Sequence, residues 1–348
     1  MDSTPKTAIL NAILHRFLKQ RLVPYVKNWL QHIAMSIRNI NLVYRRRHMV
    51  PDYQQITGRI RALSDRTLVH IVPDNMLDIR IMSRLNQWPS ISFSPSLLLA
   101  FSPPRGPLYS GKVLPKSEQM TLMAKGGVRT PKWAFLAPDK TFDEAMWGKA
   151  VIVKPNVFGW SSGGAGIELV RTDAVRYIPR EAYPPEHPGR QGDMLVQQFI
   201  DSGEHSEDYR VVTMFGHPLY ALKRKSLVRI ANVFEGAVER TRAGVVSNAG
   251  ARESREVHLC YEEPVLKFAS LVYLAIPQVP FQAVDIRRDI NTGHLYCLEI
   301  NPGGFTWNFS SKRARQTPTI DGVRREDQFG AWEIAAKALV SMADSQAA

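Results

Sequence analysis

The sequence of 348 residues has few cysteines, no long apolar run and few acidic residues in its first sixty positions. Its two cysteines, Cys260 and Cys297, supply neither a disulfide framework nor the spacing of a metal site. Both lie among apolar residues, which favours buried thiols in a reducing compartment, and we therefore expect a cytoplasmic protein. The most apolar stretch, residues 265–281, contains Lys267 and two prolines, so no membrane-spanning helix is expected.

Acidic residues are outnumbered by basic ones, 32 to 45, which gives a formal net charge of +13. This excess favours anionic partners such as nucleic acid, a membrane surface, or a phosphorylated or carboxylated substrate. It is concentrated in residues 1–60, where Asp2 and Asp52 are the only acids and residues 45–47 are three successive arginines.

Residues 5–48 repeat apolar side chains at three- and four-residue spacing, and Pro24 divides the pattern into two predicted amphipathic helices. Such helices could pack on the body of the protein with a solvated basic face. They could also lie on an anionic membrane or act as a targeting presequence. The sequence leaves these three interpretations open.

Beyond residue 50, strands and helices interleave, which predicts a mixed α+β or α/β protein. Some predicted elements are clear from turn and capping signals, above all an amphipathic helix that ends at two glycines and precedes a strand. The other signals are strand-like runs bounded by turns. The predictions are a strand and a helix in 68–85, a connection in 89–107, the glycine-terminated helix and its strand in 114–136, several strands from 150 onward, and helices at 262–274 and 328–342.

A glycine- and serine-rich loop follows an apolar strand that ends near Lys154. Glycine lets backbone N–H groups approach phosphate oxygens closely, and a lysine can neutralise the same phosphates. The Walker pattern is absent, so this loop is not a P-loop. On its own, such a loop is most often a hairpin connection.

Three oxygen-bearing side chains lie on two adjoining predicted strands near the end of the chain. Glu299 and Asn301 are two positions apart in "LYCLEINPGG", so they project from one face while Leu298 and Ile300 face into packing. Asp285 lies between apolar neighbours on the preceding strand, where a carboxylate needs a partner or a metal. Hard oxygen ligands suit Mg²⁺ bound with nucleotide phosphates, so the set predicts a magnesium site. Polar residues at a fraying strand end are the alternative.

Taken in order, these motifs resemble the ATP-grasp superfamily, especially its carboxylate–amine ligases of the glutathione synthetase and ribosomal-protein glutamate-ligase type. The resemblance covers about residues 112–312 and is carried by "VIVKP", "LVQQFI", "EDYRVVTMFGHPLYALKR" and "AVDI…LEINPGG". It implies an ATP-grasp fold, in which two α+β lobes hold ATP between them after a smaller N-terminal region. The implied division is a basic helical region at 1–50, a small α/β region at 51–112, a first lobe with a glycine-rich flap at 113–193, and a second lobe with the metal site at 194–348.

The resemblance also implies roles for individual residues. Nucleotide phosphates would be bound by Lys116, Lys154, Ser161, Ser162, Gly163 and Gly164. The base and ribose would be bound by Gln197, Gln198, Phe199, Ile200 and Asp208, although Gln198 stands where the family usually has glutamate. Magnesium would be bound by Asp285, Glu299 and Asn301. The catalytic residues would be Arg210, Arg224, Arg242 and Asn248, of which the last two lie in a passage that departs from the family's spacing.

The implied activity is ATP-dependent formation of an amide or peptide bond through an acylphosphate, with ADP and phosphate as products. The implied cofactors are ATP and two Mg²⁺ ions, with Mn²⁺ as a substitute. The substrates would be an amine and a small-molecule or peptide carboxylate, and the basic composition favours an anionic one. The alternatives are an ATP-grasp kinase and a non-catalytic ATP-binding module that docks on an anionic surface through the basic N-terminus. A monomer and a homo-oligomer are both open.

Overall fold

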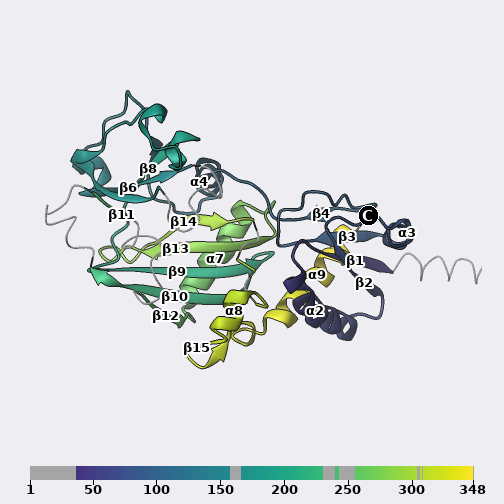
Figure 1. Cartoon of the computed structure of the whole chain (residues 1–348). Coiled ribbons are helices and arrows are strands. Elements are labelled where there is room, and N and C mark those ends of the chain that lie inside the picture. The colour runs from purple at the N-terminus through teal and green to yellow at the C-terminus, as the bar shows by residue number, and fades with distance from the viewer. Residues whose placement is uncertain are drawn as a thin grey trace, which may run out of the picture.

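The computed structural model describes residues 37–156, 166–229, 240–242, 255–303, 306–307 and 309–347 (Figure 1). The amphipathic pattern of residues 5–36 and most of the glycine-rich loop lie outside these residues. No helix in the described ranges has the length and apolar character needed to cross a bilayer.

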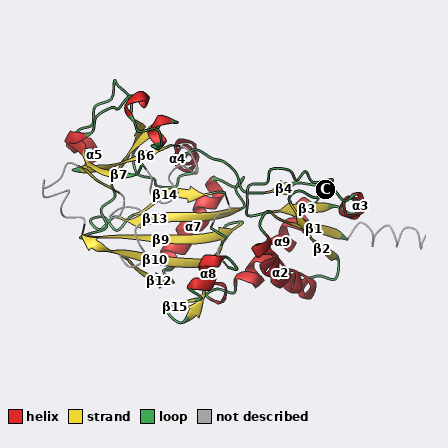
Figure 2. Cartoon of the chain, viewed as in Figure 1, coloured by secondary structure: helices red, strands yellow, loops and turns green. Residues whose placement is uncertain are grey.

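The N-terminal unit is a parallel sheet of four strands in the order β2-β1-β3-β4. Helix α2 covers one face together with the C-terminal helix α9, and α3 lies on the other (Figure 2). The elements of this unit are β1 (Arg38–Tyr44), η1 (Arg47–Met49), α2 (Val50–Leu63), β2 (Thr67–Pro73), α3 (Ile79–Asn86), β3 (Ser90–Phe93), β4 (Leu108–Tyr109) and α9 (Ala331–Gln346).

Two sequence predictions are wrong in this unit. Residues 38–44 form strand β1 instead of the end of a helix, and β3 lies inside the passage expected to be a connection. Both strands carry buried polar side chains that hide the apolar pattern of an interior strand. Asn39 donates to the carbonyls of Arg84 and Leu85, and Asn41 donates to Ser92 across the β1–β3 pair, so the N–H groups of both amides have partners inside the fold.

The first lobe is an antiparallel sheet in the order β11-β7-β6-β8-β5. The predicted helix in 114–136 is confirmed, and it ends at Gly126 as the glycine pair indicated. The elements are α4 (Lys116–Lys125), β5 (Trp133–Phe135), α5 (Glu144–Trp147), β6 (Ala150–Pro155), β7 (Glu168–Arg171), η2 (Thr172–Ala174), η3 (Arg180–Ala182), η4 (Pro188–Arg190), β8 (Met194–Gln198) and β11 (Arg240–Arg242).

The second lobe is a larger antiparallel sheet in the order β12-β10-β9-β13-β14, with α7 packed on one face. Alternate residues of β9, β13 and β14 point into the core beneath α7, among them Val211, Val284 and Ile300. The elements are β9 (His205–Met214), β10 (His217–Arg229), β12 (Arg255–Leu259), α7 (Glu263–Ala275), β13 (Phe281–Arg288) and β14 (Leu295–Asn301).

The chain after β14 returns to the N-terminal unit and ties it to the second lobe. Trp307 packs against Tyr53 and Phe281 and donates its indole N–H to Asp52 of α2 at 2.8 Å. Helix α9 then packs along α2, so one apolar core joins the first and last described segments. The remaining elements are α8 (Lys312–Gln316), β15 (Thr319–Ile320), β16 (Val323–Arg324) and η6 (Arg325–Asp327). A mixed α/β chain with two α+β lobes and a smaller N-terminal region is therefore confirmed.

Candidate active site

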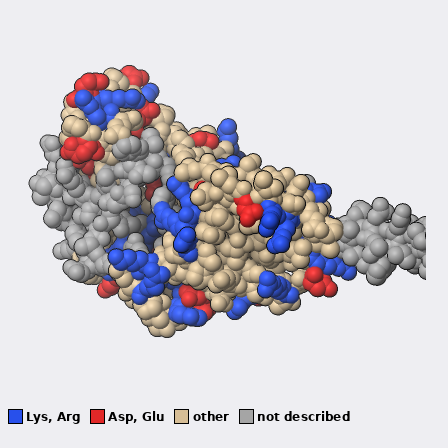
Figure 3. Space-filling view, turned by 45° about the vertical axis from the view of Figure 1, so that its right-hand side comes forward, with Lys and Arg blue, Asp and Glu red and all other residues tan. Residues whose placement is uncertain are grey.

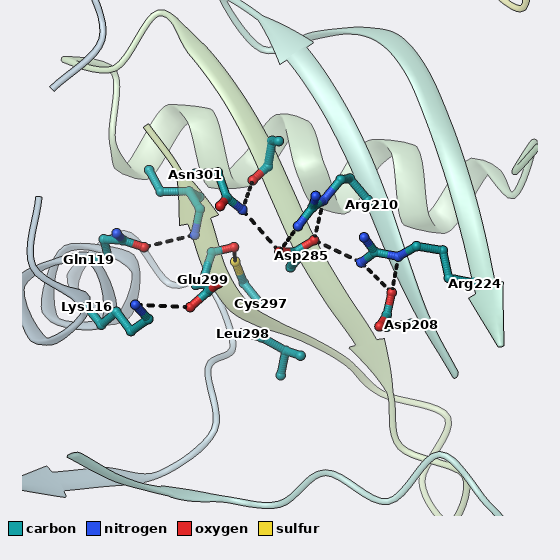
Figure 4. Close-up of polar contacts among 12 residues, drawn as sticks. Lys116, Gln119, Asp208, Arg210, Arg224, Asp285, Cys297, Leu298, Glu299 and Asn301 are labelled. Carbon is teal, nitrogen blue, oxygen red and sulfur yellow. Dashed lines mark hydrogen bonds and ion pairs between the residues drawn. The ribbon is translucent and has the colours of Figure 1, made fainter. Parts of the chain in front are cut away.

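Five charged residues of the second lobe lie on the sheet face opposite α7, in rows that follow the strand register (Figure 4). Arg210 of β9 pairs with Asp285 of β13, which pairs in turn with Glu299 of β14. Arg224 of β10 lies opposite Asp208 of β9 in the next row. Side chains of directly paired residues share a face, so antiparallel pairing alone gathers these five groups.

A β-bulge places Glu299 in its row. The register pairs Asp285 with Glu299 but Ile286 with Cys297, so Leu298 is an extra residue on β14. Cys297 therefore turns into the core under α7, whereas Glu299 faces the site. The prediction that Leu298 packs in the core beside Ile300 is wrong: Leu298 is half-buried, and its carbonyl accepts from Lys154 Nζ at 3.4 Å.

Asp285 is held as a carboxylate by two arginines. Arg210 donates to it through Nε at 2.8 Å and Nη2 at 2.6 Å, Arg224 Nη2 adds a bond of 3.0 Å, and Asn301 Nδ2 adds one of 3.1 Å. Burial by itself would raise the pKa of Asp285, but the charges of Arg210 and Arg224 outweigh it and lower the pKa to about 2. Arg224 also bonds Asp208 through Nε at 2.5 Å.

Glu299 faces two buried lysines of the first lobe. Its Oε2 lies 3.6 Å from Lys116 Nζ and 3.7 Å from Lys154 Nζ, and both lysines are about 5% exposed. Burial lowers the pKa of Lys154 to about 8, with Lys116 acting in the same direction and Glu299 against it. These two pairs connect the lobes at the predicted phosphate lysines.

Asn156, at the end of β6, fixes the start of α4 and was missed by the sequence analysis. Its carbonyl accepts from the backbone N–H of Lys116 and its side-chain oxygen from that of Ser117, both at 2.9 Å. The first N–H groups of a helix have no partner within the helix, so Asn156 supplies the missing acceptors. At the same time Gln119 of α4 accepts from the backbone N–H of Ile300 at 2.8 Å, which ties the helix to β14.

The predicted base-binding segment runs beside the same rows. Gln197 donates to the Leu298 carbonyl at 3.4 Å, and Gln198 exchanges bonds with the backbone of Lys132. Ile200 is buried, and the ring of Phe199 lies 5.4 Å from the guanidinium carbon of Arg287.

Arg287 of β13 is a second residue that the sequence analysis missed, because an arginine two positions after Asp285 has no distinctive spacing signal. It is 3% exposed and donates to Ser206 at 2.7 Å, and its buried Nε has no hydrogen-bond partner among the described residues. Burial lowers its pKa, against the effect of Asp208. The site therefore contains a fifth cation with a donor to spare.

Some predicted site residues cannot be placed. Arg242 ends β11, which pairs with β7, but its side chain is not described. Ser161, Ser162, Gly163, Gly164 and Asn248 lie outside the described residues. The structure does bring together the other candidates, namely Lys116, Lys154, Gln197 to Ile200, Asp208, Arg210, Arg224, Asp285, Glu299 and Asn301.

The donor set suits a hard cation bound together with an anion. No cluster of three or more His, Cys, Asp or Glu positioned for a metal occurs in the described ranges; the expected set instead has two carboxylates and the Asn301 amide. Around it stand five cations, Lys116, Lys154, Arg210, Arg224 and Arg287, against three carboxylates, Asp208, Asp285 and Glu299. Asp201 also acts on Arg287, and positive charge is still in excess among these described groups. Such a cluster fits Mg²⁺ only together with a strongly anionic ligand such as a polyphosphate.

No family model matches the chain, and no curated protein matches it. Several solved structures are similar to it. A D-alanine–D-alanine ligase from Bacillus anthracis shares 12% identity over 89% of this chain and 98% of its own, with a TM-score of 0.43. The ATP-grasp ligase PsnB in complex with its minimal precursor shares 13% over 88% and 99%, with a TM-score of 0.45. The macrocyclase MdnC bound to precursor peptide MdnA, from Microcystis aeruginosa MRC, shares 11% over 88% and 100%, with a TM-score of 0.46. One of these three is described as an ATP-grasp ligase, the superfamily that the sequence motifs resemble.

Proposed function

We propose that the chain is an ATP-grasp carboxylate–amine ligase. It would use ATP and Mg²⁺ to convert a carboxylate into an acylphosphate and then join the acyl group to an amine, with release of ADP and phosphate. The observation that supports this best is the excess of buried positive charge around Asp285 and Glu299.

Electrostatics gives the reason. Leaving a charge buried and unpaired costs several kcal/mol, so a buried cluster in which cations exceed carboxylates is suited to an anion. At an effective dielectric constant near 20, each close contact between a cation and a phosphate charge contributes about 4 kcal/mol before desolvation. A triphosphate carries several charges that such a group of cations would attract, which favours a nucleotide over a singly charged acid.

The nucleotide-binding roles follow from position. Lys116 and Lys154 would bind phosphates between the lobes, and Glu299 would exchange its lysine contacts for a magnesium ion shared with Asp285 and Asn301. Bound there, Mg²⁺ would neutralise phosphate oxygens as a Lewis acid. Gln197 to Ile200 would line the base, and Asp208 would accept from ribose hydroxyls. Ser161, Ser162, Gly163 and Gly164 are assigned to the phosphates from the resemblance alone.

The catalytic roles belong to the arginines. Arg210 and Arg224 are already fixed on the site face by Asp285 and Asp208, so they would stabilise the charge of the transferring phosphoryl group without reorganisation. A substrate carboxylate is itself repelled by the triphosphate, and the same cations would reduce that repulsion. Arg242 and Asn248 are proposed to contact the acyl substrate.

An ADP-release screen over pools of carboxylic acids and amines, followed by mass spectrometry, tests this function. We expect ADP release that depends on both an acid and an amine. The product should have the combined mass of the acid and the amine less that of one water. A phosphorylated product without amine would indicate a kinase instead, and nucleotide binding without turnover in any pool would indicate a non-catalytic module. Glu299→Gln should abolish turnover, whereas Glu263→Gln, at an exposed pair on α7, should leave it unchanged.

A further inference from the structure

Three large apolar side chains are exposed at one edge of the N-terminal sheet. Leu77, Ile79 and Leu99 are 91%, 84% and 71% exposed, and no other large apolar side chain of the described residues is as exposed. The first two lie between β2 and the start of α3, and Leu99 lies in the segment after β3. Both segments follow the carboxyl ends of strands that run parallel to β1, so they lie at the same edge. We call these three side chains the apolar tips.

The two segments that carry the apolar tips are joined by Asp74. Its carboxylate accepts from the backbone N–H groups of residues 99, 100 and 101 at 3.1, 3.2 and 2.9 Å. Met76 from one segment and Leu98 from the other pack on the same small core between the sheet and α3. The tips are therefore presented together on a packed support. Exposed apolar groups that lie together mark a surface that binds a partner.

Positive charge borders the apolar tips. Arg45 donates to the Leu97 carbonyl at 3.3 Å and so lies beside the second segment, and Arg80 directly follows one of the tips. Both arginines are exposed. The aspartates of these segments accept from backbone groups instead: Asp74 as described, and Asp78 from the first N–H groups of α3 at 2.8 and 3.4 Å. Figure 3 brings this end of the molecule forward and shows groups of Lys and Arg on a largely uncharged surface, with fewer Asp and Glu.

Apolar tips bordered by cations fit the surface of an anionic bilayer. The apolar side chains would enter the boundary between headgroups and acyl chains, and the arginines would meet anionic headgroups. A second copy of this chain would bring the same cations together in a symmetric contact, which like-charge repulsion opposes. Residues 1–36, which lie outside the described residues, carry five Lys and Arg against the single acid Asp2, so their charge has the same sign as this surface. Charge complementarity therefore favours a lipid surface over either of these.

We propose that the apolar tips insert into an anionic lipid bilayer while Arg45 and Arg80 bind its headgroups, so that the chain is a peripheral membrane protein. Figure 1 shows α3 at the end of the molecule away from the first lobe, so a bilayer at the start of α3 does not cover that lobe. None of these residues belongs to the candidate active site, so the attachment holds with or without ligase activity. Three side chains and a few charges give reversible binding rather than permanent anchoring.

Co-flotation of the full chain with vesicles tests the proposal. The vesicles contain phosphatidylcholine alone or an equal mixture of phosphatidylcholine and phosphatidylglycerol. The test variant replaces the three tips: Leu77→Ser, Ile79→Ser, Leu99→Ser. The matched control replaces three other exposed leucines, all on the second lobe: Leu227→Ser, Leu271→Ser, Leu274→Ser. A charge variant combines Arg45→Ser with Arg80→Ser, and circular dichroism confirms that every variant is folded.

We expect the wild-type chain to bind the mixed vesicles and to bind them more weakly as salt is added. The test variant should bind about tenfold more weakly or worse, because most of the inserted apolar area is lost. The charge variant should lose about tenfold at low salt, because each basic residue near an anionic surface adds to the attraction. The control should change the affinity by less than about twofold.

Equal losses in the test variant and the control, or no loss in the test variant, would overturn the proposal. Sedimentation that shows a wild-type dimer and a monomeric test variant would also overturn it, since the tips would then bind a second copy. Tighter binding to polyaspartate than to the mixed vesicles would assign the surface to an acidic polypeptide instead.

A dye at one tip distinguishes insertion from simple adsorption. Cys260 and Cys297 are both buried, so a thiol-reactive nitrobenzoxadiazole dye would label Leu77→Cys selectively. Its emission should become stronger and shift to shorter wavelength with mixed vesicles, because the dye enters an apolar phase. The same dye on Leu274→Cys should not respond. Unchanged emission at position 77 while the chain floats with the vesicles would contradict insertion.

Discussion

Replacing Asp285 by asparagine should destabilise the second lobe by about 2–4 kcal/mol at neutral pH. The lower figure comes from linkage: a pKa lowered from 3.8 to about 2 corresponds to about 2 kcal/mol of stabilisation of the ionised form. The upper figure comes from breaking a buried ion pair, which costs about 3–5 kcal/mol because its partner stays buried without compensation. We favour a value toward the lower figure, since linkage already includes the cost of burying the carboxylate and Arg224 keeps its bond to Asp208.

Urea unfolding of the wild-type and Asp285→Asn chains between pH 2 and 7 measures this difference. The folded-state pKa is depressed, so the stabilisation is complete above the unfolded-state value near 4 and is lost as pH falls through about 2. The difference in free energy of unfolding between the two chains should therefore be constant above about pH 5 and fall toward zero near pH 2. Glu263→Gln, at an ion pair that is about three-quarters exposed, should unfold at the same urea concentration as wild type. A difference in free energy of unfolding below 1 kcal/mol at pH 7, or one that persists at pH 2, would refute the assignment of Asp285 as a carboxylate that the two arginines keep ionised.

Four further outcomes are expected. Lys154→Ala should lower turnover by about a thousandfold in an ADP-release assay, because one preorganised phosphate contact is lost, while the circular dichroism spectrum is retained. Asn156→Ala should remove the side-chain acceptor of the Ser117 N–H at the start of α4, cost about 1 kcal/mol in thermal unfolding and raise the KM for ATP. Asp52→Ala should leave the buried indole N–H of Trp307 unpaired and cost about 1–3 kcal/mol in urea unfolding. Treatment with EDTA should stop ADP release, and added Mg²⁺ or Mn²⁺ should restore it; turnover that survives chelation would contradict the role of Asp285 and Glu299.

The second lobe could be predicted from sequence because its signals are local. Strands β9, β10, β13 and β14 contain apolar runs bounded by clear turns, which indicate strands. The pairing of Asp285 with Glu299 follows from adjacent antiparallel strands and is observed. Their contacts with Lys116 and Lys154 depend on how two lobes meet, which only the resemblance indicated.

The failures have physical causes. Asn39, Asn41 and Ser92 are polar residues inside a sheet, and their hydrogen bonds come from distant segments that no local pattern contains. The bulge at Leu298 reverses the strict alternation on which the placement of Leu298 depended. Asn156 acts on a helix that begins forty positions earlier, so its capping role appears only when β6 and α4 are side by side.

Helix α9 has a consequence for how the protein is made. It covers the apolar face of β1 and β3, packing against Ile40 and Leu42 through residues such as Ala335 and Leu339. On the ribosome, the N-terminal sheet and α2 are synthesised long before this helix emerges, so the part of the face that α9 covers stays open to water until then. Closure of the first unit must therefore wait until translation has passed residue 346, and chaperones have that whole interval in which to bind the nascent chain.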